Sequence, residues 1–294
     1  MGIFSSNRKE GPGVRKNEAQ KKGFFRFTEL YFRKFWDLCK VNLLFVACMV
    51  PLLGLSYLGL KYFPQNINGL ALLIPPALCG PLVAGMTYVV RNFVTERHSF
   101  LFSDFLEQAK KNLAQSLAVS LLDTVAGYLL FLAIRVYLTR MQYESLVFAL
   151  PFALAMVLAL IFLFMNYYVF LMIVTVDLPL TGILKNALLF CVLGIAKNLF
   201  ITVWGGVLLF ACLWYFPLTL FFIVPIGFTT FTMITCFNAY PIMDKYIVTP
   251  YYQRQKEEHP ELFDDEPVFH DELIEEQPHS ELMDTWNSRK PQDK

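Results

Sequence analysis

The sequence predicts an all-α fold, a polytopic membrane helix bundle with about six transmembrane helices and short amphipathic helices at the membrane interface. Two long stretches, Asn198–Met243 and Ser145–Val176, contain no Asp, Glu, Lys or Arg. A helix needs roughly 20 apolar residues to cross a ~30 Å hydrocarbon core, so the first stretch fits two crossings and the second fits one. Hydrophobic residues make up 56% of the chain and charged residues 17%, against about 25% charged in an ordinary globular protein. This composition excludes a typical soluble domain.

Charged residues mark the ends of the expected spans. The six spans are residues 41–60, 67–90, 113–134, 147–174, 199–215 and 218–240. They belong to a membrane domain at residues 24–252, which follows a basic polar segment at 1–23 and precedes an acidic tail at 253–294. Both flanking segments are expected to be disordered. The last two spans meet at Pro217, where we expect a tight turn.

Three segments between or before the spans are expected to lie on the membrane surface as amphipathic helices. They are Phe24–Lys40, Ser99–Asn112 and Thr181–Lys197, each with apolar residues at a spacing of three to four. A Lys-Asn-Leu sequence ends the second and third and opens the next span. This shared layout is a weak hint of an internal repeat; the alternative is that any interfacial helix needs a cationic end and a polar start.

The distribution of Lys and Arg predicts the orientation. The short loops on one side contain only Lys61, Arg135 and Arg140, whereas the loops and flanks on the other side contain many more basic residues. Because basic residues concentrate on the cytoplasmic side, both termini are expected to be cytoplasmic.

Asp123 is the candidate functional residue inside the membrane. It lies near the middle of the third expected span, where a carboxylate costs a few kcal/mol to insert and should face the interior of the bundle. One interpretation is a proton or cation site, or a contact with a transported substrate. The other is a structural hydrogen bond between helices.

Proline and glycine are expected to interrupt three spans. They occur at Pro51 and Gly54 in the first span, at Pro75, Pro76, Gly80 and Pro81 in the second, and at Pro225 and Gly227 in the sixth. Broken helices mark binding sites in transporters, but kinks that allow close packing are the more common cause.

A few other polar residues near the span ends have ordinary interpretations. The cluster Asn166, Tyr167 and Tyr168 is typical of the aromatic belt at a membrane interface. Asn42 and Asn238 are close to span ends and are expected to contact water. The segment Glu266–Asp271 of the acidic tail mixes apolar and acidic residues, so it is either a partner-docking segment or part of a solvated tail.

Sequence signatures of enzymes are missing from the chain. The histidines are scattered and form no His-Glu-x-x-His or Cys/His array, and there is no Gly-x-Ser-x-Gly, P-loop or Gly-x-Gly-x-x-Gly sequence. We therefore expect no catalytic residues, no metal, no cofactor and no nucleic-acid partner.

Several of these segments together resemble the YesL-like family of bacterial integral membrane proteins, a domain of unknown function. The resemblance is carried by Val41–Phe45 with Pro51–Leu53, Tyr88–Arg91 with Ser103–Asn112, and Asp177–Leu180 with Leu184–Phe190, Pro225–Phe228 and Tyr240–Tyr246. It covers about residues 23–252. It implies a multi-span helical domain in a bacterial inner membrane and an accessory role in sugar uptake or envelope physiology, and it implies no site residues.

The expected function is accordingly that of a non-enzymatic membrane protein that assists or regulates a carbohydrate transport system or envelope physiology. Its expected partners are the lipid bilayer and, through the cytoplasmic face, components of an ABC transporter or other membrane proteins. The alternative is a transporter, or a substrate-binding membrane subunit, that uses Asp123 and the broken helices.

Overall fold

The computed structural model describes residues 23–258, and in this range helices are joined by turns with no strand. Contacts between residues divide the chain into two units, Met1–Tyr246 and Ile247–Lys294. Most of the two segments expected to be disordered, 1–23 and 253–294, lies outside the described residues, as does the docking segment Glu266–Asp271; residues 253–258 are described and are helical.

The first unit consists of helices that follow one another with short connections. In chain order they are α1 (Phe24–Arg33), α2 (Phe35–Tyr62), the 3-10 helix η1 (Asn68–Leu73), α3 (Ile74–Leu78), α4 (Gly80–Val94), α5 (Leu101–Lys111), α6 (Leu113–Tyr143), the 3-10 turn η2 (Leu146–Phe148), α7 (Ala149–Ile173), α8 (Leu180–Leu193), α9 (Ile195–Trp214), α10 (Leu220–Phe222), the π-helical turn η3 (Ile223–Gly227) and α11 (Phe228–Met243). The π-helical turn η4 (Asp244–Val248) runs into the second unit, whose described part contains α12 (Thr249–Glu258).

Six helical segments in the described range are long and apolar enough to cross a membrane, as predicted. They are Phe35–Tyr62, Asn68–Val94, Leu113–Tyr143, Leu146–Ile173, Ile195–Trp214 and Leu220–Tyr251. The all-α membrane fold is thereby confirmed. Most of these segments are longer than the predicted spans. In particular, α6 continues beyond Ile134 and carries Arg135 and Arg140 in its last turns. Long Arg side chains can reach the headgroups from such positions.

Two of the three expected amphipathic segments are separate short helices, α5 and α8. The prediction of one helix over Phe24–Lys40 is wrong, because the helix is interrupted at Lys34 and the residues from Phe35 onward belong to α2. The break lets α1 turn away from the axis of α2 and pack against α11, where Tyr31 and Thr230 share a hydrogen bond of 2.8 Å.

The order of elements is the same in α4–α5–α6 and in α7–α8–α9. In each, a longer helix ends next to a Val-Thr pair: α4 ends at Val94, and α7 ends just before Val174. A short helix follows, and a single residue, Asn112 or Gly194, separates the short helix from the next long helix. The internal repeat itself stays a prediction.

The proline and glycine residues interrupt only some of the helices that they were expected to break. The second span is broken at Cys79, between α3 and α4, and the sixth contains the π-helical turn η3. By contrast, α2 is continuous through Pro51 and Gly54. The expected interruption of the first span is therefore wrong.

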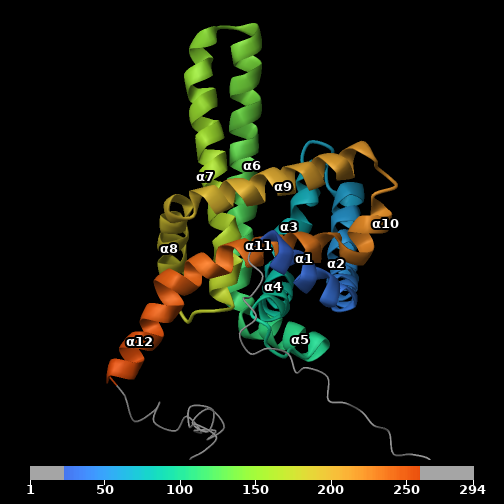
Figure 1. The fold of residues 1–294 in the computed structure, drawn as a ribbon. Coiled ribbons are helices and arrows are strands. Elements are labelled where there is room, and N and C mark those ends of the chain that lie inside the picture. The colour runs from blue at the N-terminus through green and yellow to red at the C-terminus, as the bar shows by residue number, and fades with distance from the viewer. Residues whose placement is uncertain (1–22, 259–294) are drawn as a thin grey trace, which may run out of the picture. The chain divides into compact units, whose positions relative to one another are not determined.

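Buried side chains in the first unit concentrate at one end of the long helices. Figure 1 shows α6 and α7 as a long hairpin that extends beyond the other helices, with α9 running across its direction. At the buried end, α4 approaches its neighbours through glycine. A Cβ on Gly80 would collide with the Ser116 backbone oxygen, and one on Gly85 with that of Phe105. These close approaches fix where α4 meets α5 and α6.

Candidate functional site

The C-terminus of α4 ends in a turn that places a glutamate in a backbone conformation normally occupied by glycine. The N–H of Glu96 donates to the Phe93 carbonyl (3.2 Å), and the N–H of Arg97 donates to the Asn92 carbonyl (2.9 Å), the two bonds of a Schellman motif. Glu96 has φ 56°, in the left-handed region. A residue with a Cβ is disfavoured there relative to glycine, so a glutamate is unusual at this position.

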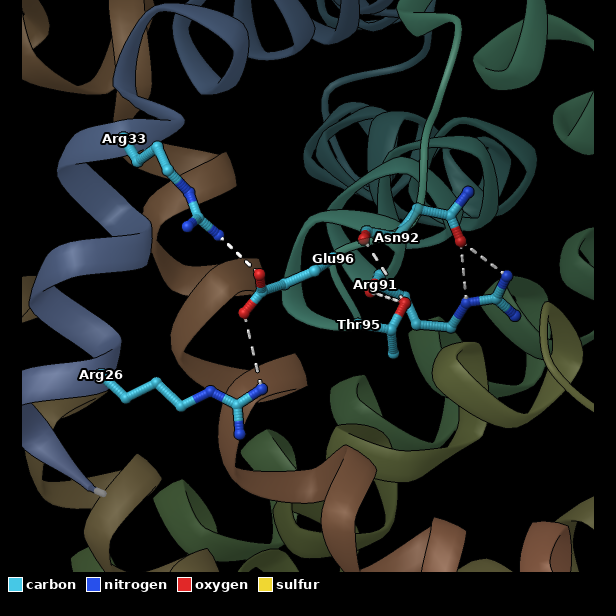
Figure 2. A network of polar contacts seen from close by, with 6 residues as sticks. All are labelled: Arg26, Arg33, Arg91, Asn92, Thr95 and Glu96. Carbon is cyan, nitrogen blue, oxygen red and sulfur yellow. Dashed lines mark hydrogen bonds and ion pairs between the residues drawn. The ribbon is translucent and has the colours of Figure 1, made fainter. Parts of the chain in front are cut away.

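Two arginines of α1 hold the Glu96 carboxylate. Figure 2 shows Arg33 and Arg26 converging on it from one side, at N···O distances of 3.0 Å and 3.7 Å. All three side chains are about half exposed. Each ion pair therefore contributes little stability, because water screens it. The two ion pairs nevertheless show that α1 lies beside the C-terminal end of α4.

The second contact of α1 is with α11. Phe27 packs edge-on against Phe237, and Tyr31 shares its hydrogen bond with Thr230. Burial raises the pKa of the Tyr31 hydroxyl above its ordinary value, so the group stays neutral. The opposite side of this region carries large exposed aromatic side chains. They are Phe24, Phe25, Phe32 and Trp36, each at least 65% exposed.

Arg91, one turn before the end of α4, is a buried cation. Its side chain is 7% exposed, and its Nη1 donates to the Val174 carbonyl (2.7 Å) and the Thr175 hydroxyl (3.2 Å). Its Nε and Nη2 donate to the Asn92 side-chain oxygen (Figure 2), and the guanidinium lies over the Tyr88 ring at 4.6 Å. Val174 caps the C-terminus of α7, where the helix dipole favours a positive charge. Arg91 thus ties the end of α4 to the end of α7.

Asp123, the candidate predicted from the sequence, is half-buried on α6 and faces α7. The Asn166 side-chain nitrogen lies 3.5 Å from its Oδ1 and also donates to the Phe162 carbonyl (3.1 Å). Ser120, three residues before Asp123 on α6, donates its hydroxyl to the carbonyl of Ala77, next to the break between α3 and α4 (2.7 Å). The structure therefore brings Asp123 close to the broken second span.

The break in the second span is itself filled by side chains of α6. The Ser120 hydroxyl donates to the Ala77 carbonyl (2.7 Å), and Gly80 packs directly on Ser116. A freed carbonyl at membrane depth needs such a partner, because no water is available there.

The π-helical turn η3 of the sixth span is bound by α2. Asn42 donates to the carbonyls of Ile223 (3.0 Å) and Val224 (2.7 Å), and its oxygen accepts from the Thr229 N–H (3.0 Å). Asn42 is completely buried, so the prediction that it contacts water is wrong. Its side chain satisfies backbone groups that the proline and the π-helical turn release.

The tyrosines predicted to be an aromatic belt are also buried. The Tyr168 hydroxyl donates to the Asn198 side-chain oxygen (2.7 Å), and the Asn198 nitrogen donates to the Phe190 and Cys191 carbonyls at the end of α8. Tyr167 shares a hydrogen bond with Thr202 (2.9 Å). The belt interpretation is wrong because both rings pack inside the helix assembly, next to α8 or α9.

The sequence did not predict that Arg91, Glu96 and Asn198 connect separate helices through their side chains. Arg91 looked like an ordinary span boundary, and Glu96 like a loop charge. A signal was present for Glu96, since it occupies the position after a helix where glycine or asparagine is usual. Between residues 23 and 258 no group of three or more His, Cys, Asp or Glu side chains could hold a metal ion. That the protein needs no cofactor stays a prediction.

Comparison with known proteins connects part of this assembly to an uncharacterised family. A family model described as "Protein of unknown function, DUF624" matches residues 38–134, about one third of the chain. The matched segment contains Arg91, Glu96 and Asp123, but not α1 or α7. No curated protein and no solved structure matches the chain. The family description names no activity, and the resemblance to the YesL-like family stays a prediction.

Proposed function

We propose that this membrane protein has no catalytic activity of its own and assists or regulates a transport system through the end of the bundle that carries α1 and α5. The observation behind the proposal is the network around Glu96, which fastens an amphipathic helix to the end of α4 while that helix keeps its aromatic residues exposed. A glutamate kept at a glycine-type position to hold α1 is consistent with a helix whose placement matters.

The way the chain uses its buried polar side chains supports a structural and binding role. Asn42, Arg91, Ser120 and Asn198 each bind backbone carbonyls of a second helical segment. Such bonds stabilise close helix contacts within a membrane. These side chains therefore use their hydrogen-bond donors to hold helices together.

The transport system that we propose is one for carbohydrates, in a bacterial inner membrane with both termini cytoplasmic. The carbohydrate link rests on the resemblance of residues 23–252 to the YesL-like family. The orientation rests on the bias of Lys and Arg, which puts α1, α5 and Glu96 on the cytoplasmic side. Components of an ABC transporter would meet the protein there.

Reconstitution of the purified protein alone tests this proposal. Vesicles that contain only this chain should show no sugar or proton flux above empty vesicles, whereas the chain isolated from native membranes should carry transporter subunits after crosslinking. A flux comparable to that of a transporter, from the chain alone, would contradict the accessory role.

A second candidate function, a transporter, is favoured by one observation. Asp123 and Asn166 form a polar pair beside the broken second span, the kind of helix discontinuity at which transporters bind substrates. If the chain transports, Asp123→Asn should abolish flux, while Thr139→Val, which removes a hydroxyl farther along the same helix, should leave it unchanged. Equal flux for Asp123→Asn and the wild type would exclude a role of this carboxylate in transport.

A further inference from the structure

A pocket of about 550 Å³ lies between η1 and α6, in a different part of the first unit from the Glu96 network. Its lining is mainly apolar, with Leu70 and Leu73 from η1 and Phe131 and Leu132 from α6. Arg135 on α6 also lines it and is its only charged residue. A mainly apolar pocket with one cation has the character of a site for an anionic amphiphile.

Arg135 has no acidic partner in the part of the chain that the structure describes. The nearest acid along the sequence toward the hairpin tip, Glu144, is paired instead with Arg140 at 3.9 Å, and Arg140 also lies over the Phe148 ring at 5.4 Å. Arg135 is an exposed guanidinium within a helix whose neighbouring residues are apolar. Arg135 is therefore available to pair with an anion from outside the described chain.

The position of Arg135 along α6 places it near the level of lipid phosphates. It lies 22 positions after Leu113, the first residue of α6, or about 33 Å at 1.5 Å per residue. The hydrocarbon core is ~30 Å thick. If Leu113 is at one membrane interface, Arg135 is at the other, and Arg140 is about 8 Å farther out.

We propose that this pocket binds an anionic phospholipid of the surrounding bilayer. The Arg135 guanidinium pairs with the phosphate, a geometry in which two parallel N–H···O bonds form. An acyl chain covers the apolar side chains around the pocket, since Leu70, Leu72 and Phe131 are 45%, 61% and 57% exposed. The bound lipid would fix η1 against α6 at the end of the bundle away from Glu96.

The test uses the full-length chain in detergent, titrated with phosphatidylglycerol, with bound lipid counted by native mass spectrometry. Two variants remove the site in different ways. Arg135→Gln removes the charge, and Gly69→Leu fills the space, because a Cβ at Gly69 has no atom within 4 Å and this residue lines the pocket. Each should weaken the apparent affinity of the first lipid bound about tenfold.

Two matched variants serve as controls. Arg140→Gln removes a cation that is already paired, and Gly54→Leu adds a side chain at another glycine with open space around it. Both should bind phosphatidylglycerol as the wild type does. The proposal is overturned if Arg135→Gln and Gly69→Leu bind phosphatidylglycerol normally. It is overturned as well if the two control variants lose as much affinity as the two site variants. It is also overturned if inorganic phosphate displaces the lipid, since the site would then select a free anion.

Discussion

The two halves of the α6–α7 hairpin are built on different principles. In the half near α5, Ser116, Val119 and Ser120 of α6 are buried, as is most of the α7 segment from Phe164 to Ile173. In the half toward the hairpin tip, Leu129, Leu150 and Leu154 are 59%, 79% and 60% exposed. The same two helices are thus protein core at one end and lipid-facing surface at the other.

This difference shows where sequence specificity resides in the molecule. In the buried half, polar groups and glycines set the distance and register between helices, so single atoms matter. In the exposed half, lipid tails replace protein as the packing partner, and one apolar side chain substitutes for another at little cost. Substitutions should therefore separate the two halves by the size of their effect on stability.

The largest effect is expected at Arg91. Arg91→Leu removes the donors to Val174 and Asn92 and leaves their buried oxygens without these bonds, at a cost of about 3 kcal/mol. Arg91→Lys should cost less, since a lysine keeps the charge but lacks the guanidinium fork. Unfolding in mixed micelles measures both. Arg140→Leu, near the hairpin tip, is the control, and an equal loss from it would remove the distinction between the halves.

A smaller effect is expected from two glycines, Gly80 of α4, which contacts the buried half of the α6–α7 hairpin, and Gly127 of α6, which lies in its exposed half. Gly80→Ala brings a Cβ onto the Ser116 backbone and should destabilise the fold by about 2 kcal/mol through overpacking. Gly127→Ala, toward the hairpin tip, meets only the Phe162 ring at 3.7 Å, an ordinary contact. It should be neutral or slightly stabilising, because alanine favours a helix over glycine. Thermal unfolding measures both variants. An equal drop in the two unfolding midpoints would contradict the difference between the two halves.

Asn198→Leu tests the polar connection between α7, α8 and α9. The substitution leaves the Tyr168 hydroxyl without its acceptor and the Phe190 carbonyl without the amide donor, which should cost about 1.5 kcal/mol. The double variant Asn198→Leu with Tyr168→Phe should recover part of this loss, since the buried hydroxyl is then absent. Additive losses in the two single variants would show that the residues do not interact.

The smallest effect on stability is expected at Glu96. Glu96→Gly loses two half-exposed ion pairs, together about 1 kcal/mol or less after screening by water, but relieves the left-handed backbone by a similar amount. Global stability should hardly change, while α1 should detach more often. Limited trypsin cleavage after Arg33 should therefore be faster in Glu96→Gly and Glu96→Gln than in the wild type. Unchanged cleavage in both would show that the carboxylate does not hold α1.

The sequence was sufficient for the spans and insufficient for their contacts. The uncharged stretches and their bounding charges predict all six long helices, because the bilayer acts on each segment independently. The burial of Asn42 and Tyr168 depends on residues far away in the chain, Ile223 and Asn198 respectively. Nothing in the local sequence reveals such a partner, so both looked like residues at an interface.

The candidate site was predicted only in part for the same reason. Asp123 stands out because a carboxylate in an apolar span is unusual, and the structure does give it a polar neighbour, Asn166. Arg91 does not stand out, because a cation at a span end is ordinary. Only the position of the α7 C-terminus, brought beside it by folding, turns it into a buried connection.

Site-specific photocrosslinking in native membranes tests most directly whether the α1–α5 end binds a partner protein while the exposed half of the α6–α7 hairpin contacts lipid. A photoreactive residue at Phe102 of α5 and one at Leu154 of α7 would be almost equally exposed, at 63% and 60% in the native side chains. The Phe102 probe should form an adduct with a transporter subunit, identified by mass spectrometry, and the Leu154 probe should label lipid alone. A transporter adduct at Leu154 with none at Phe102 would contradict the proposed role of the α1–α5 end.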